Sequence, residues 1–332
     1  MYQNRGYHFQ KIYCIILIMK SQKTGWLIVN HFLHTNKFSE IYSWLLTAAT
    51  KAGCKLLLKT NAELLCSITD HTLLEASSSI RPDFVLFWDK DIRLARFLEH
   101  LGLRLFNCAD AIALCDDKSL TFTALSHSNE MSPHDNIHSP FIPMPKTILA
   151  PMTYSNIGYS HDFSFLDQVI SVLHFPLIVK ECFGSFGAQV YLAHSEQELS
   201  TILNHCDSRP IIFQEFIKSS FGRDLRLQVV GNEVIATMLR THASDFRANI
   251  TNGGTMLNYE PSEAACNLAL HVCRSLKLDF AGVDLLFGEH DEPILCEVNS
   301  NAHFKNIHTC TTVNAAEKII EMILQKLEME KQ

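Results

Sequence analysis

The chain has 332 residues, of which 47% are hydrophobic and 19% are charged. A chain of this length and apolar content can bury the cores of two or three packed units, which excludes disordered and fibrous proteins. The formal net charge is −7, and no run of Lys and Arg interleaved with aromatic residues is present, so nucleic-acid binding has no support.

The first twenty residues do not fit a folded element. Arg5 and Lys11 precede the apolar run Ile12–Met19, which superficially resembles a signal peptide, but no small-residue cleavage site follows. The run is also much shorter than the roughly 20 apolar residues that cross a membrane. Because Met19 stands just before the first convincing strand, we expect residues 1–20 to be a disordered extension or an upstream mis-start.

Residues 21–110 are predicted to form an N-terminal α/β domain. Its strands are expected at Trp26–Val29, Leu56–Leu58, Phe84–Trp88 and Leu103–Phe106. Two helices are expected between them, one capped by Ser39 and ending at Gly53, the other capped by Asp91 and ending at Gly102. Strands that alternate with helices predict a small parallel sheet with helices on both faces.

The remaining residues are predicted to form two further units, 111–213 and 214–330, with a loop at Asn129–Pro145 that has no apolar period. Strands are expected at Lys146–Ala150 and Leu177–Lys180, and a hairpin around Gly231 joins Leu225–Val230 to Val234–Leu239. Helices are expected from Pro261 to Leu276 and from the cap Asn314 onward.

Two apolar runs near the C-terminus, Phe280–Phe287 and Pro293–Asn299, each contain one carboxylate. If they pair with Phe287 opposite Ile294, then Asp284 lies opposite Glu297, and Asn299 shares the face of Glu297. Like charges that face each other on a sheet repel, so a positive group is expected between them. Two carboxylates and an amide oxygen suit Mg²⁺. The alternative is a hairpin whose acids lie in solvent at an edge.

Lys180 ends an apolar strand and is followed at once by a turn that contains Gly184 and Gly187. The backbone amides of a glycine turn can approach a phosphate closely while a lysine ammonium neutralises it. The pattern is not a Walker loop, because the turn leads into a strand and no Gly-Lys-Ser/Thr follows. An ordinary hairpin with a lysine that reaches water is the alternative interpretation.

A polar sheet face is expected on the strand that begins at Arg223. With a period of two, Asp224, Arg226 and Gln228 share one face, and the apolar residues between them face the core. The following stretch adds Arg240, Arg247 and Asn249. Arginines suit phosphate because their forked hydrogen bonds spread its charge. A solvated sheet surface is the alternative.

The order of these features resembles the motifs of RimK-like ligases in the ATP-grasp superfamily. The likeness covers roughly Cys108 to Lys326. The motifs that carry it are Lys118, Lys180 with its glycine turn, Gln214-Glu215-Phe216-Ile217, Arg223-Asp224-Leu225-Arg226, Phe246-Arg247-Ala248-Asn249, Gly253-Gly254, Ala281-Gly282-Val283-Asp284 and Glu297-Val298-Asn299. The resemblance implies an ATP-grasp fold of α/β and α+β units that holds a nucleotide between two subdomains, behind a small N-terminal parallel-sheet domain.

The resemblance also implies roles for individual residues. Toward ATP, it implies Lys118, Lys180, Gly184 and Gly187 at the phosphates, Glu215 and Phe216 at the adenine edge, Asp224 at the ribose, and Arg247 and Asn249 at the phosphates and the reacting centre. It implies Arg226 and Arg240 near the transferred phosphoryl group, so that Arg226, Arg240 and Arg247 are the catalytic candidates. It implies Asp284, Glu297 and Asn299 as ligands of Mg²⁺, for which Mn²⁺ can substitute.

The reaction that the resemblance implies is the ligation of a carboxylate to an amine. ATP phosphorylates the carboxylate, and an amine such as that of glutamate attacks the acylphosphate to give an amide, ADP and phosphate. A site of Lys, Arg and Mg²⁺ with no evident nucleophile suits this chemistry, because it requires positioning and charge neutralisation. The alternatives are a phosphotransferase that stops at a hydroxyl group and a nucleotide-binding regulatory module without turnover.

One segment departs from the family pattern. Ser300-Asn301-Ala302-His303-Phe304-Lys305 stands where the glutamate ligases resemble one another in a Ser-Pro-Gly turn. The loop is expected beside the metal and the acceptor, so transfer of glutamate to a ribosomal protein does not follow from the resemblance. We expect Asn301–Lys305 to line the acceptor pocket, whether the acceptor is a peptide or a small molecule.

The partners expected from the whole sequence are ATP, a carboxylate substrate and an amine substrate, with no nucleic acid and no membrane. The eleven cysteines are scattered without C-x-x-C spacing, which is typical of reduced thiols in a cytoplasmic protein. Homo-oligomer formation is left open by the sequence.

Overall fold

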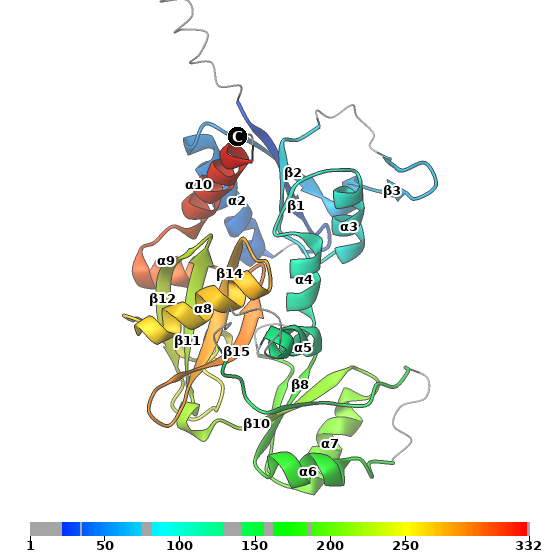
Figure 1. Ribbon diagram of the computed structural model, residues 1–332, viewed down its shortest axis with the longest axis vertical. Coiled ribbons are helices and arrows are strands. Elements are labelled where there is room, and N and C mark those ends of the chain that lie inside the picture. Colours follow the sequence, from blue (N-terminus) through cyan, green and yellow to red (C-terminus); the bar gives the residue numbers. More distant parts are fainter. Residues whose placement is uncertain are drawn as a thin grey trace, which may run out of the picture.

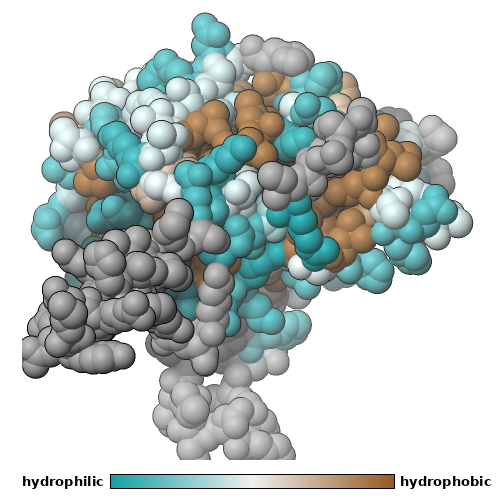
Figure 2. All heavy atoms as spheres, turned by 90° about the horizontal axis from the view of Figure 1, so that it is seen from above, coloured by the Kyte–Doolittle hydropathy of each residue, from teal (hydrophilic) through white to brown (hydrophobic). Residues whose placement is uncertain are grey.

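The computed structural model describes residues 22–33, 35–74, 81–128, 141–155, 162–184 and 187–330. Three main sheets follow one another through the molecule, with the N-terminal sheet and the middle sheet at opposite ends (Figure 1). On the face seen from above, hydrophobic side chains form patches among hydrophilic ones (Figure 2). Within the described ranges, no helix has both the length and the apolar composition needed to cross a bilayer. The expected extension at residues 1–20 lies outside these ranges and stays a prediction.

The N-terminal sheet is parallel throughout, as predicted, with strand order β2-β1-β5-β6. Its strands are β1 (Thr24–Val29), β2 (Lys55–Thr60), β5 (Phe84–Phe87) and β6 (Leu105–Phe106). Side chains alternate between its faces: Leu27 packs toward α2 (Asn36–Lys51) and α10 (Ala315–Met329), while Ile28 packs toward α3 (Ile92–His100) and α4 (Ala109–Asp116). The last helix of the chain therefore helps to bury the first sheet, as Figure 1 shows.

The start of helix α2 differs from the prediction. The helix begins at Asn36 with Thr35 in an extended conformation at the N-cap, four residues before the predicted cap Ser39. The hydroxyl of Ser39 instead donates to the carbonyl of Asn36 inside the first turn. Phe38 packs against the core of the sheet, so burial of this ring favours helix earlier in the chain than the capping pattern indicated. Asp91 and Asn314 are caps, as predicted.

The middle sheet is antiparallel with strand order β7-β10-β8-β9. Its strands are β7 (Thr147–Leu149), β8 (Leu177–Glu181), β9 (Val190–Ala193) and β10 (Ile211–Glu215). Helices α6 (Leu166–Leu173) and α7 (Glu196–Cys206) cover one face through Val179 and Phe213. The other face carries Ile178 and Lys180, because successive side chains of a strand alternate.

The third sheet has the order β13-β12-β11-β14-β15 and is antiparallel. Its strands are β11 (Arg223–Val230), β12 (Glu233–Thr241), β13 (Thr255–Asn258), β14 (Phe280–Phe287) and β15 (Pro293–Asn299). Helix α8 (Glu263–Ser275) covers its apolar face, and the predicted hairpin turns at Gly231, whose φ is 61°. The other elements are η1 (Asn61–Glu63), β3 (Cys66–Ser67), β4 (Thr72–Leu73), α5 (Lys118–Ser128), η2 (Lys218–Ser220), η3 (Ile250–Asn252) and α9 (Lys305–Thr311).

The β14–β15 hairpin confirms one predicted pair and corrects another. Phe287 lies opposite Pro293 and not opposite Ile294, so the predicted register is wrong next to the turn. The register then shifts by one residue between Asp284 and Leu285, and beyond this point Asp284 does lie opposite Glu297. The extra residue in the bulge is Cys296. Because a bulge interrupts the alternation of side chains, Cys296 and Glu297 both reach the side of the middle sheet.

Candidate active site

A narrow pocket of about 100 Å³ lies between the middle sheet and the third sheet. Its apolar walls are Ile178 of β8 and Leu286 of β14, and its charged residues include Lys118 and Lys180. Most of the residues that the sequence predicted for ATP line it together: Lys118, Lys180, Gly187, Glu215, Phe216, Asp224, Arg247 and Asn249. The pocket combines apolar walls with cations, as a site for a base and its phosphates requires.

The end of β10 forms one edge of this pocket. The backbone N–H of Glu215 donates to the carbonyl of Lys146, and its carboxylate accepts from the N–H of Lys146. Phe216 makes edge-to-face contacts with Phe221 and Phe246, at centroid distances of 6.4 and 6.3 Å. These contacts fix the strand end where an adenine edge is predicted to bind, although the amide of Glu215 is already bonded within the protein.

The polar face of the third sheet is an ion-pair network that crosses three strands. Asp224 lies directly opposite Arg240, and Arg226 lies directly opposite Asp284. Arg240 Nε donates to Asp224 Oδ1 at 2.5 Å, and Arg240 Nη2 lies 3.1 Å from Asp284 Oδ2. Both Arg226 Nε and Nη2 donate to Asp284, the latter at 2.7 Å. Asp224, Arg240 and Asp284 are buried, so this face is not the solvated surface that was the alternative.

Burial and charge act against each other on these acids. Burial raises the pKa of Asp284, but Arg226 and Arg240 outweigh it and hold that pKa below the ordinary value. Burial also raises the pKa of Asp224, and the negative charge of Asp284 adds to this shift against the opposing effect of Arg240. Burial lowers the pKa of Arg240, yet Asp284 and Asp224 together keep it above its ordinary value. Arg240 therefore keeps its positive charge although it is buried.

The two carboxylates of the hairpin are each neutralised by protein side chains. Asp284 is bound by two arginines, and Glu297 lies 3.4 Å from the ammonium of Lys118. The expectation that Asp284 and Glu297 repel each other until a metal ion joins them is therefore wrong. The positive groups that were expected between them belong to the chain itself. The ammonium of Lys180 lies 3.5 Å from the carbonyl oxygen of Cys296, which ties β8 to the bulge.

The glycine turn after β8 is held against the third sheet by Arg247. Its guanidinium donates to the carbonyl of Gly187 at 3.1 Å and pairs with Asp245 at 2.8 Å. Gly187 has a φ of 72°, and a Cβ built there would lie 2.4 Å from Asn249 Oδ1. Glycine is therefore required at this position. Gly184 accepts a long hydrogen bond of 3.4 Å from Lys118 and lines a second, larger cavity.

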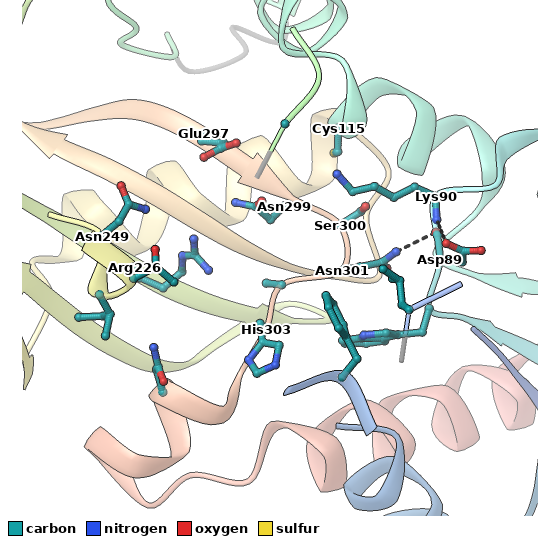
Figure 3. Close-up of a pocket in the computed structure, with 18 of the residues that line it drawn as sticks. Asp89, Lys90, Cys115, Arg226, Asn249, Glu297, Asn299, Ser300, Asn301 and His303 are labelled. Atoms are coloured by element: carbon teal, nitrogen blue, oxygen red, sulfur yellow. Dashed lines mark hydrogen bonds between the residues drawn. The ribbon is translucent and has the colours of Figure 1, made fainter. Parts of the chain in front are cut away.

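This second cavity has a volume of about 480 Å³ and lies between the N-terminal domain and the third sheet. Arg240, Asn249 and Glu297 line both cavities, so the two spaces meet at these side chains. In Figure 3, Arg226, Asn249 and Glu297 lie on one side of the larger cavity, and Asp89 and Lys90 lie on the other. The three predicted site residues that line both cavities therefore come from β12, from β15 and from the segment after β12.

Several residues of the larger cavity were not predicted from the sequence. Asn30 directly follows β1, and Asp89 is the second residue after β5, the adjacent parallel strand; both line the cavity together with Trp88. Ligands of open α/β sheets bind outside the carboxyl ends of the strands. That rule, applied to the polar residue after each predicted strand, was the signal that would have found Asn30 and Asp89.

The loop after β15 lines the larger cavity in part. Asn301 and His303 line it, as expected, and Asn306 follows from helix α9. Lys305 does not line it: its ammonium pairs with Glu40 of α2 at the surface. The predicted acceptor segment therefore ends before Lys305, because the helix that begins there turns this side chain toward α2.

The fit of Mg²⁺ can be tested on the side chains of Asp284, Glu297 and Asn299. All three offer hard oxygen donors, and the Nδ2 atom of Asn299 has no partner that would hold the amide in another orientation. The carboxylate of Asp284 already accepts three hydrogen bonds, so about one of its four lone-pair sites remains. Among the described residues no group of three or more His, Cys, Asp or Glu side chains gathers around one point. The residues fit an ion that takes further ligands from phosphate and water.

Comparisons with known proteins show which family and which solved structures this chain resembles. The model of the RimK-like ATP-grasp domain matches residues 117–323. An uncharacterized protein of Mycoplasma pneumoniae is 31% identical over 240 residues, which are 72% of this chain and 79% of that protein. Human N-acetylaspartylglutamate synthase A is 32% identical over 77% of this chain and 60% of its own length, so the chain spans less than two thirds of it.

The solved structures support the fold. The chain is similar to a RimK domain protein ATP-grasp from Sphaerobacter thermophilus, with a TM-score of 0.66 and 19% identity. The likeness covers 90% of this chain and 98% of that one. At this identity the likeness concerns the fold, which is the ATP-grasp fold that the sequence predicted.

Proposed function

Because the chain belongs to the RimK-like ATP-grasp family, we propose that it is an ATP-dependent ligase that joins a carboxylate to an amine. The observation that supports this most directly is the junction of the two cavities at Arg240, Asn249 and Glu297. A nucleotide in the narrow pocket and a carboxylate in the larger cavity would meet there. An enzyme that transfers a phosphoryl group between them needs this arrangement.

The narrow pocket is proposed to hold ATP. Lys118 and Lys180 would neutralise its phosphates, and Gly187, whose carbonyl accepts from Arg247, would allow them a close approach. Ile178 and Leu286 would sandwich the base. A volume of about 100 Å³ is smaller than the roughly 300 Å³ of an ordinary ligand pocket, so the middle and third sheets have to separate when the nucleotide enters.

The reaction proposed for the junction has two steps. The γ-phosphoryl group leaves ADP and bonds to a carboxylate oxygen, while Arg226 and Arg240 neutralise the charge on the phosphoryl oxygens. The neutral amine then attacks the acyl carbon, the carbon–oxygen bond to phosphate breaks, and the amine loses a proton as the amide forms. No side chain has to act as a nucleophile.

Asp284, Glu297 and Asn299 are proposed as the ligands of Mg²⁺ or Mn²⁺. Such an ion supplies positive charge to the phosphates of the nucleotide. Glu297 is well placed for this role because it lines both cavities. Asp284 also holds Arg226 and Arg240 in place, so it has a structural role apart from metal binding.

Glutamate is the proposed amine substrate. The name of the human relative states a product in which N-acetylaspartate is joined to glutamate. The larger cavity of this chain, about 480 Å³ in volume, is large enough for an amino acid beside a second small substrate. The segment Ser300–His303 contributes to its wall, so the acid substrate can differ from that of the relative.

A screen of ADP release tests the proposal. Purified protein with Mg-ATP is given pairs from a panel of carboxylic acids and amines, including L-glutamate. We expect release only when both an acid and an amine are present. Release that needs a hydroxyl compound would identify a phosphotransferase instead, and ATP binding without any release would identify a regulatory module.

A further inference from the structure

The larger cavity has a corner rich in hydrogen-bond acceptors that the proposed reaction does not use. We call it the Asp89 corner; it consists of Asn30, Tyr42, Trp88, Asp89 and Asn301. Asn30 and Asp89 follow adjacent strands of the parallel sheet, and Asn301 comes from the loop after β15. The Nδ2 atom of Asn301 donates to the backbone carbonyl of Asp89 at 2.8 Å, which joins the two segments (Figure 3).

Asp89 is a buried carboxylate with no cationic partner in the part of the chain that the structure describes. It is only 7% exposed and accepts hydrogen bonds from the backbone N–H of Lys90 at 2.7 Å and from Asn30 Nδ2 at 3.2 Å. The ammonium of Lys90 pairs with Asp116, and no other described lysine, arginine or histidine pairs with Asp89. Burial raises the pKa of Asp89 above its ordinary value. Because buried carboxylates are rarely left unpaired, this one suits a ligand that brings a positive charge.

The neighbouring loop offers two more atoms without partners. The Oδ1 atom of Asn301 has no hydrogen-bond partner among the described residues, whereas its Nδ2 atom donates to the backbone carbonyl of Asp89. Ser300, which is 2% exposed, also lines the cavity, and its Oγ atom has no partner. Unpaired buried polar atoms cost free energy, so their presence in a cavity wall indicates that a ligand completes them. A carboxylate, an amide oxygen and a hydroxyl can all accept hydrogen bonds from a primary ammonium group.

The Asp89 corner lies away from the reacting centre. Asn301 is four residues beyond Glu297, which is up to about 13 Å of extended chain. Figure 3 shows Asp89 and Glu297 on opposite sides of the cavity, with the loop from Asn299 to Asn301 between them. A group bound at Asp89 therefore lies across the cavity from Glu297, and we do not assign it as the amine that reacts. It is a group by which the substrate is recognised.

We propose that the Asp89 corner binds a free ammonium group of the acid substrate, which is therefore an amino acid or short peptide that is not N-acylated. Its carboxylate reaches the junction while its ammonium pairs with Asp89 and lies beside the rings of Trp88 and Tyr42, which favour a cation. This inference rests on the proposed ligase function and names the class of its acid substrate.

The test compares acids that differ only in the charge of the amino group. L-aspartate is paired with N-acetyl-L-aspartate, and L-glutamate with N-acetyl-L-glutamate. Hydroxylamine serves as the amine in every assay, because it traps acylphosphates as hydroxamates and leaves only the acid to vary. ADP and hydroxamate are both measured for the wild type, for Asp89→Asn and for the control Asp110→Asn. Asp110 is 78% exposed and pairs with Arg96 on the surface.

We expect the wild type to have a higher kcat/KM for the free-amino member of at least one pair. Asp89→Asn should lower that value by about 10- to 100-fold through KM, the usual effect of losing a hydrogen bond between charged groups. Its KM for ATP and its activity toward N-acetylated acids should stay within about two-fold, and Asp110→Asn should match the wild type. Equal use of both members by the wild type, or an equal loss for both in Asp89→Asn, would overturn the proposal.

Failure of the ligase function gives a different result. In that case no acid supports ADP or hydroxamate formation, and the Asp89 corner is tested by calorimetric titration of L-aspartate and N-acetyl-L-aspartate with Mg-ADP present. Binding of L-aspartate alone, abolished in Asp89→Asn, supports the corner without turnover. Binding of neither compound, or equal binding of both, would overturn the proposal that the Asp89 corner binds an ammonium group. Thermal melts of the apo variant show that it is folded, and no loss of stability is expected because a buried unpaired charge has been removed.

Discussion

The carboxylates Asp284 and Glu297 face each other but differ in burial, so replacing them separately should cause different losses. Asp284 is 3% exposed and pairs with Arg226 and Arg240. Breaking a buried pair by removing one partner costs about 3–5 kcal/mol. Asp224 still holds Arg240 after the change, so Asp284→Asn should cost about 3 kcal/mol and lower the Tm by about 5–10 °C.

Glu297→Gln should leave the apo protein almost unchanged. The side chain of Glu297 is 28% exposed, and its distance of 3.4 Å from Lys118 is that of a weak pair, worth about 0–1 kcal/mol. Its proposed role lies in nucleotide binding. At a concentration 100-fold above Kd, Mg-ATP stabilises a protein by about 2.7 kcal/mol, and a ten-fold rise in Kd would remove about half of this. Turnover should fall by about two orders of magnitude or more, since the metal ligand acts on the transferred charge.

The assay is a set of thermal melts with and without Mg-ATP, combined with ADP release, for both variants. Near-normal turnover of Glu297→Gln, or full retention of its stabilisation by Mg-ATP, would refute the metal assignment. An unchanged apo Tm of Asp284→Asn would refute the structural role of the ion-pair network. The two variants are matched controls for each other, because they remove one charge from directly opposite positions of the same hairpin.

Three further predictions concern single side chains. His303→Ala should change the preference among acids or amines by about ten-fold and leave the KM for ATP unchanged. Lys305→Ala should not change this preference, because Lys305 lies outside the cavity. Equal changes of preference in the two variants would refute the placement of the loop. Gly187→Ala should raise the KM for ATP by about ten-fold or more, because φ at this residue is 72° and the new Cβ would clash with Asn249. A KM for ATP within two-fold of the wild-type value in steady-state kinetics would contradict this prediction. Burial raises the pKa of Cys296 to about 11, so at pH 8 iodoacetamide should alkylate this thiol about 100-fold more slowly than an ordinary thiol. Mg-ATP should slow the alkylation further. Rapid labelling of Cys296, measured by peptide mass spectrometry, would contradict this prediction.

The elements of the N-terminal domain were predictable because their patterns are local. Apolar runs, caps such as Asp91 and the glycines after helices indicated the strands and helices in order, and alternation of the two indicated a parallel sheet. The start of α2 was missed because Thr35 and Ser39 are both acceptable caps. The choice between them depends on the packing of Phe38 against a core that includes residues far away in the sequence, which no local pattern contains.

The candidate site was predictable as a set of residues but not as a set of contacts. The order of the motifs predicted Lys118, Lys180 and Glu297 as members of one site, and in the structure all three line the same pocket. The partners of Asp284 were not foreseen, because they depend on β11 lying between β12 and β14. The pairing of Asp284 with Glu297 was predicted from one register along the whole hairpin, but the actual register differs by one residue near the turn. The bulge at Cys296 supplied the missing residue.

The charged side chains beside the bulge determine the net charge that a ligand of this site should have. Six cationic side chains stand around the site: Lys118, Lys180, Arg223, Arg226, Arg240 and Arg247. The carboxylates of Glu215, Asp224, Asp284 and Glu297 lie among them, and Arg223 and Arg247 pair with Asp291 and Asp245. The site is thus nearly neutral before a nucleotide enters, and a triphosphate would add several negative charges next to Asp284 and Glu297. Because uncompensated charge in a partly buried space is costly, the nucleotide has to bring positive charge with it. A divalent ion that enters with the phosphates would meet this need, and the proposed donors Asp284, Glu297 and Asn299 would then need to supply only part of its ligands.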